Sequence, residues 1–141
     1  MEALSAFFAE NAERKEDVSF VVSTRFKGKD GKPIPWVLQS ISAEDDESLR
    51  KDCTRRVQVP GKKGQYTNSF DSNAYLVKLA VKSVKFPDLN NAELQNSYRA
   101  MGAEQLIVTM LYKDEFDALA EKLTNMSTAE DINDLVAEAK N

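Results

Sequence analysis

The chain has 141 residues, of which 42% are hydrophobic and 30% are charged, and its net charge is -4. This length suits one compact domain, and this composition excludes a disordered chain and a chain built mainly to coat a phosphate backbone. No window approaches the roughly 18 to 20 apolar residues that cross a bilayer, so no membrane association is expected.

The N-terminal part of the chain predicts a helix followed by a β-hairpin. Leu4, Phe7 and Phe8 recur at helical spacing, which predicts a helix over residues 3–12. From residue 18 the apolar side chains alternate with polar ones, as in a strand, and an Asp-Gly pair supplies a turn. We therefore expect a hairpin over residues 18–41, whose two prolines place the start of the return strand at a sheet edge.

A helix over residues 43–57 should follow the hairpin. Ser42 is a good N-cap residue, and the acidic run Glu44–Glu47 suits the N-terminal end of a helix dipole. Leu49, Cys53 and Val57 would form the buried line of this helix. The stretch from residue 57 to 67 contains one proline and two glycines, which indicates an exposed loop.

The second half of the sequence predicts helices alone. They are expected at residues 71–84, 90–100, 103–111, 114–125 and 128–139. The last helix begins with a capping-box pattern and has Ile132 and Leu135 on its apolar stripe. The fold class expected for residues 1–141 is α+β, a mostly α-helical single domain with an N-terminal β-hairpin packed on helices.

The sequence has few residues suited to catalysis. It has no histidine, which removes the usual general base and zinc ligand, and no nucleotide-binding glycine pattern. The acidic run Glu44–Glu47 is best explained as a solvated first turn of a helix, Cys53 as a small buried hydrophobe, and Trp36 as a core anchor. We therefore expect no catalytic residue, no metal site and no cofactor, and an enzyme is the least favoured class.

A local basic cluster is the most informative feature of this acidic chain. Six basic residues fall within fourteen positions, namely Arg50, Lys51, Arg55, Arg56, Lys62 and Lys63. They could bind an acidic protein segment or a phosphate backbone. Alternatively, they pair with the neighbouring acidic run and are otherwise solvated.

Several separated segments, in the same order along the chain, resemble the tail assembly chaperones of PBSX-type phages and prophages of Gram-positive bacteria. These segments are Val18–Phe26, Gly31–Trp36, Cys53–Tyr66, Phe86–Tyr98 and Met101–Glu104. The resemblance implies a protein of the host cytoplasm, absent from the mature virion, that binds the phage tape measure protein and keeps it soluble for tail tube assembly. The tail tube protein is a second partner to consider, whereas nucleic acid and membrane are not expected.

The residues that contact this partner are a hypothesis. We expect the contacts to involve Arg55, Arg56, Lys62, Lys63, Tyr66, Ile132 and Leu135. Two other classes stay open, a structural tail completion or connector protein of the virion and a small nucleic-acid-binding module. A homo-oligomer formed by edge pairing of the hairpin is also open.

Overall fold

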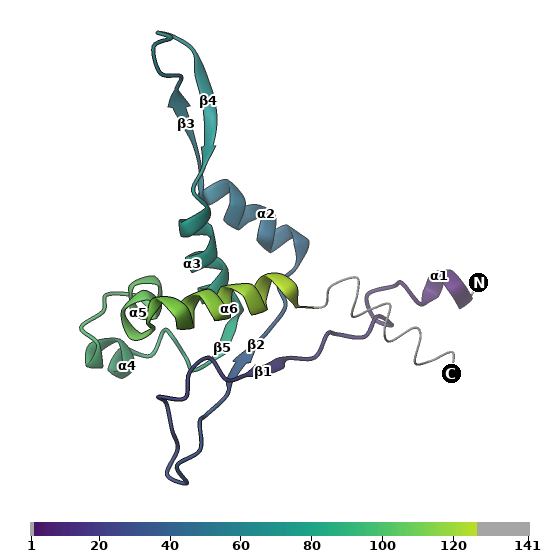
Figure 1. The fold of residues 1–141 in the computed structure, drawn as a ribbon. Helices are drawn as coiled ribbons and strands as arrows, with labels where there is room; N and C mark the ends of the chain where they lie inside the picture. Colours follow the sequence, from purple (N-terminus) through teal and green to yellow (C-terminus); the bar gives the residue numbers. More distant parts are fainter. Residues whose placement is uncertain (1, 127–141) are drawn as a thin grey trace.

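A computed structural model describes residues 2–126 and has the expected α+β fold (Figure 1). The helices are α1 (Glu2–Ser5), α2 (Ala43–Asp52), α3 (Ser72–Ser83), α4 (Ala92–Ser97), α5 (Ala103–Met110) and α6 (Lys113–Asn125). The strands are β1 (Val18–Phe20), β2 (Trp36–Leu38), β3 (Thr54–Gln58), β4 (Tyr66–Phe70) and β5 (Val84–Phe86). The helix predicted at residues 128–139, with Ile132 and Leu135, lies outside the described residues.

The larger sheet has the strand order β1-β2-β5 and is antiparallel throughout. β1 pairs with β2 as the predicted hairpin requires, with Phe20 opposite Trp36. The expectation that the return strand begins at a sheet edge is wrong, because β2 begins only after both prolines and has a partner on each side. β5 supplies the second partner and follows directly from the end of α3.

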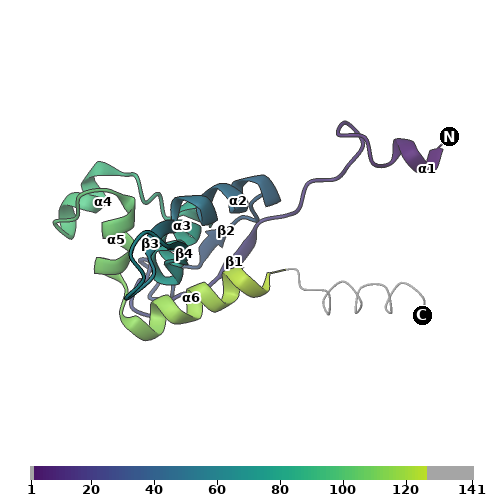
Figure 2. The same cartoon turned by 90° about the horizontal axis from the view of Figure 1, so that it is seen from above.

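The main core lies between this sheet and helices α3, α5 and α6. Its largest fully buried side chains are Trp36, Leu38, Leu106, Ile107 and Leu119. α3 packs directly against α5 and α6, and Figure 2 shows α2 beside α3. A smaller cluster of Cys53, Tyr75 and Leu79 fills the junction between α2 and α3.

The structure corrects the expected helix at residues 43–57. α2 ends at Asp52, because Cys53 leaves helical geometry and its N–H donates to the carbonyls of the last turn. The next residues form β3, so Val57 is 38% exposed and does not continue a buried line. The stretch expected to be a loop forms the end of β3, a turn and the start of β4. The expectation that the second half contains helices alone is also wrong, because β5 (Val84–Phe86) lies between α3 and α4.

The predicted helix at residues 3–12 is also wrong, because only the single turn of α1 forms. Residues 6–12 are held by turn hydrogen bonds, such as the one from the Phe7 N–H to the Leu4 carbonyl at 3.0 Å. Such a short segment is not stable as a helix without packing on a core. The helix expected at residues 90–100 is likewise shorter, since Asn91 caps α4 and Arg99 adopts a positive φ of 56°.

Asp71 joins β4 to α3, and a substitution at this position tests its role as the N-cap residue of α3. Its Oδ1 accepts a hydrogen bond from the Ala74 N–H at 3.0 Å, which caps α3. We expect Asp71→Ala to lower the free energy of unfolding by about 1 kcal/mol, because the N–H loses its partner. Asp71→Asn keeps an accepting oxygen and serves as the control in the same urea titration. An equal loss in both variants would contradict the capping role.

Candidate partner-binding surface

The β3–β4 hairpin is the most prominent exposed feature of the molecule. Its strands pair antiparallel in regular register from Thr54 opposite Phe70 to Gln58 opposite Tyr66. Figure 1 shows it rising from the junction of α2 and α3, away from the other strands and helices. Every residue of both strands is exposed, so the two strands pack very little against the rest of the described chain.

The charge of the hairpin is opposite to that of the chain. Residues 54–70 contain four basic side chains and no acidic one, which gives the segment a charge of +4. Because the whole chain has a charge of -4, all other residues together carry -8. The hairpin is therefore a cationic projection on an anionic protein, and it would attract an acidic surface at long range.

The pairing register separates two faces of the hairpin. Arg56, Tyr66 and Phe70 lie on one face, because opposite residues share a face and alternate residues return to it. The guanidinium carbon of Arg56 lies 4.2 Å from the centre of the Tyr66 ring, a cation–π contact. Arg55 and Val57 lie on the opposite face. One face thus combines aromatic surface with positive charge.

A polar network at the base connects the hairpin to the body. Asp46 accepts a hydrogen bond from the Tyr75 hydroxyl and another from the Arg50 Nε at 2.9 Å. The hydrogen bond from Tyr75 is the largest cause that lowers the pKa of Asp46, and the hydrogen bond from Arg50 is the next largest. Burial raises the pKa of the Tyr75 hydroxyl. The Arg50 guanidinium also lies 4.5 Å from the Tyr75 ring centre and 5.8 Å from that of Phe70. These contacts fix α2 against α3 at the point where β4 ends.

The structure divides the basic cluster into two sets. Arg50 and Lys51 form ion pairs with acidic residues of their own helix, Asp46 and Glu47, at 2.9 and 3.5 Å. For these two residues, the alternative prediction that the basic cluster pairs with the acidic run Glu44–Glu47 is confirmed. The four basic residues of the hairpin have no carboxylate within their own segment. They are the part of the cluster that remains suited to a partner.

Five of the seven expected contact residues lie on one structural unit. Arg55, Arg56 and Tyr66 are on the strands, and Lys62 and Lys63 are in the turn, all of them exposed. Phe70, which was not among the expected contact residues, is exposed on the same face as Tyr66. A usable signal was present, since the β-prone segment Tyr66–Phe70 follows a Gly-rich turn.

Other kinds of site find little support in the described residues. From residue 2 to 126, no group of three acidic or cysteine side chains could hold a metal ion. No helix in this range is long and apolar enough to cross a membrane. Cys53 is buried, and burial raises the pKa of its thiol, which disfavours the reactive thiolate.

Comparison with known proteins identifies the family. The sequence model described as "Phage XkdN-like tail assembly chaperone protein, TAC" matches residues 4–140, so the chain belongs to this family of phage tail assembly chaperones. The chain is similar to the phage-like element PBSX protein XkdN of Bacillus subtilis strain 168, with 28% identity over 140 residues. These cover 98% of this chain and 93% of XkdN.

A second relative provides a solved structure. The uncharacterized protein YqbN of the same strain is 28% identical over 96 residues, covering 68% of this chain and 63% of YqbN. The crystal structure of the protein YqbN superposes with a TM-score of 0.68 at 20% identity, covering 84% of this chain and 90% of that one. This likeness supports the fold, and the family match gives the chain a role in phage tail assembly.

Proposed function

We propose that this chain binds the tape measure protein of its phage and keeps it soluble until the tail tube assembles around it. Membership of the tail assembly chaperone family supports the role, and the exposed cationic hairpin supports the mode of binding. The tape measure protein is long and helical, and its apolar stripes would aggregate before the tube covers them. The chaperone would act in the host cytoplasm and leave before the virion matures.

The charge and exposure of the hairpin carry this proposal. A segment of +4 on a chain of -4 is held away from the body with all its strand residues exposed. The chain therefore does not use most of this surface for its own stability. Arginine and tyrosine are the residue types that protein interfaces favour, and they suit an acidic, amphipathic helix. Charge complementarity would raise the association rate and help to select the partner.

Co-expression of the chain with the tape measure protein tests the proposal. We expect the tape measure protein to be soluble, in a complex with this chain, only when the two proteins are expressed together. Arg55→Glu/Arg56→Glu should weaken co-purification about tenfold at moderate salt, because two attractive contacts become repulsive. The control is Lys82→Glu/Lys113→Glu, which makes the same change in net charge at exposed positions outside the hairpin.

Two results would contradict the proposal. An insoluble tape measure protein, with this chain free in solution, would exclude the chaperone role. Equal co-purification of the hairpin variant and the control would exclude the hairpin as the binding surface. Mass spectrometry of purified tails distinguishes the chaperone from a virion component, since a tail completion or connector protein would be recovered in stoichiometric amount.

A further inference from the structure

One face of the β3–β4 hairpin carries two exposed aromatic side chains. Tyr66 and Phe70 are 52% and 44% exposed and lie four residues apart on β4, so both point to the same side of the strand. Asn68 lies between them on this side, directly opposite Arg56 of β3. We call these four residues the aromatic face. It presents a ring, a guanidinium group and a second ring in succession along about 13 Å of strand.

The opposite face of the two strands has a different character. It carries Arg55 and Val57 of β3, which pair with Ser69 and Thr67 of β4, and none of these four residues is aromatic. The two faces therefore have one arginine each but differ in apolar surface. Arginine and tyrosine are enriched among the residues that dominate binding energy at interfaces, whereas valine, serine and threonine are under-represented. The aromatic face is thus better suited to direct contact with a partner.

Contacts within the protein already order the side chains of the aromatic face. The Arg56 guanidinium lies over the Tyr66 ring at 4.2 Å. At the base of the hairpin, the Phe70 ring centre lies 5.7 Å from that of the buried Tyr75. Side chains that are ordered before binding lose less conformational entropy when a partner arrives. An open hollow of about 410 Å³, lined in part by Arg56 and Tyr66, leaves room there for a side chain of the partner.

The dimensions of this face match those of an α-helix. Neighbouring strands lie about 4.8 Å apart, so one helix about 10 Å across covers both strands. Helix residues seven or eight positions apart share one side and are separated by about 11 to 12 Å, close to the spacing of Tyr66 and Phe70. A residue halfway between them lies where Arg56 is. Because the hairpin projects from the body, a helix can lie along it (Figure 1).

We propose that the aromatic face binds an amphipathic helix of the tape measure protein in which an acidic residue is flanked, three or four positions away on each side, by apolar residues. The apolar residues pack on the two rings, and the carboxylate pairs with Arg56. This inference rests on the proposed function, to which it adds the binding face and the pattern that is recognised. Arg55 attracts the partner only at a distance, and salt screens that attraction.

Two matched pairs of single variants in the full chain test which face binds. At moderate salt, Arg56→Glu should weaken co-purification with the tape measure protein about fivefold, and Arg55→Glu less than about twofold. Both substitutions change the net charge equally at neighbouring exposed positions. Tyr66→Ser should also weaken co-purification about fivefold, and Val57→Ser less than about twofold. Each of these two changes removes an apolar side chain from a strand of the same hairpin.

A charge exchange tests the pattern on the partner and controls for misfolding. Labelled helical peptides of the tape measure protein that contain the pattern should bind the wild-type chain in fluorescence anisotropy titrations. Replacing their acidic residue with lysine should weaken this binding about tenfold. The lysine peptide should bind Arg56→Glu more tightly than it binds the wild type, a recovery that a misfolded variant does not give. Arg55→Glu should give no such recovery.

The results distinguish a failure of this inference from a failure of the proposed function. Equal losses for Arg55→Glu and Arg56→Glu would overturn the inference and leave the hairpin as the binding site, as expected if an extended segment paired with its edge and met both faces alike. Equal binding of a peptide whose acidic residue is moved two positions, to the other side of the helix, would overturn it as well. A tape measure protein that stays insoluble with the wild-type chain would overturn the proposed function and this inference with it.

Discussion

Replacing Trp36 with alanine is expected to lower the free energy of unfolding by about 4 kcal/mol, because the change opens a large cavity in the main core. The indole is 2% exposed on β2, the central strand of the larger sheet. Its ring centre lies 6.3 Å from that of Phe26 in a tilted arrangement. Because β2 is hydrogen-bonded to strands on both sides, the backbone cannot collapse far into the space.

Urea titrations followed by circular dichroism measure this effect, since the variant has no tryptophan left to report by fluorescence. Met101→Ala is the control, because its side chain is 89% exposed and its removal should change stability by less than about 0.5 kcal/mol. A loss below about 1 kcal/mol for the Trp36 variant would mean that the core does not depend on this residue.

The parts of the fold that were predicted correctly are those determined by the pattern of apolar and polar side chains along a short stretch of sequence. Alternating side chains from residue 18 predicted the pairing of β1 with β2, and the burial of Trp36 is confirmed. β5 was missed because three residues are too few to show a period. Its place beside β2 depends on a non-local pairing, that of Val37 with Phe86, which no local pattern reveals.

The β3–β4 hairpin was missed for a different reason. Leu49, Cys53 and Val57 continue a helical spacing across the boundary at which α2 ends. The helical pattern therefore masked a strand that begins at Thr54. The Gly-rich segment was correctly expected to be exposed, but it is the turn of a hairpin, with positive φ at Gly61 and Gly64. Charge alone identified most of the candidate surface, because it does not depend on the secondary structure.

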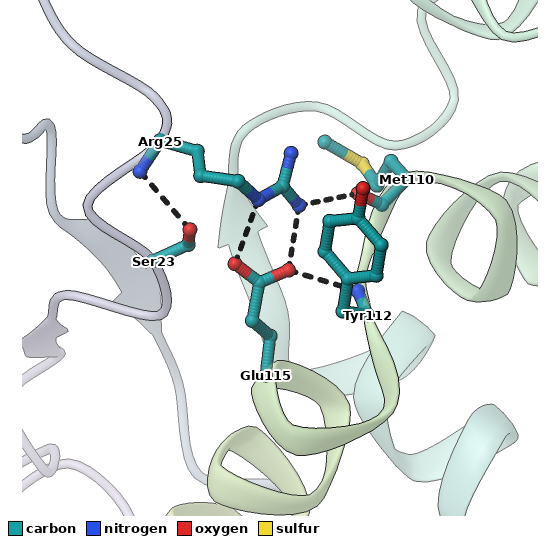
Figure 3. A network of polar contacts seen from close by, with 5 residues as sticks. All are labelled: Ser23, Arg25, Met110, Tyr112 and Glu115. Carbon is teal, nitrogen blue, oxygen red and sulfur yellow. Dashed lines mark hydrogen bonds and ion pairs between the residues drawn. The ribbon is translucent and has the colours of Figure 1, made fainter.

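Contacts between residues far apart in sequence could not be predicted at all, and one of them is the bidentate ion pair that joins Arg25 to Glu115 (Figure 3). The Arg25 Nε and one terminal nitrogen each donate to a different Glu115 oxygen, at 2.9 and 2.5 Å. The terminal nitrogen also donates to the Met110 carbonyl at 3.0 Å. The Tyr112 N–H donates to Glu115 at 2.8 Å, so the carboxylate caps the start of α6 as well.

This network ties the segment after β1 to the junction of α5 and α6. The Arg25 guanidinium lies 4.7 Å from the centre of the Tyr112 ring and 4.8 Å from that of Phe26, the residue beside Trp36. The Glu115 side chain is only 11% exposed, so solvent screens it little. The hydrogen bonds from Arg25 are the main cause that lowers the pKa of Glu115 from its ordinary 4.5 to about 2.

Glu115→Gln is therefore expected to lower the free energy of unfolding by about 2 kcal/mol at pH 7, because charge-assisted hydrogen bonds are replaced by weaker ones. The effect depends on pH in a defined direction. A carboxyl whose pKa is lower in the folded state stabilises the fold fully above the unfolded pKa of 4.5, and loses this contribution as the pH falls to about 2. The difference between wild type and variant should thus be constant from pH 7 to about 5 and shrink steadily below it.

Urea titrations of both proteins from pH 7 to pH 3 measure this difference directly. Asp117→Asn is the matched control, because this carboxylate lies on the same helix and pairs with the exposed Lys113 at 2.6 Å. Exposed pairs of this kind contribute at most a few tenths of a kcal/mol, so this control should differ little from wild type at any pH. If the Glu115 variant lost the same stability at pH 3 as at pH 7, the effect would come from altered packing and not from the ion pair with Arg25.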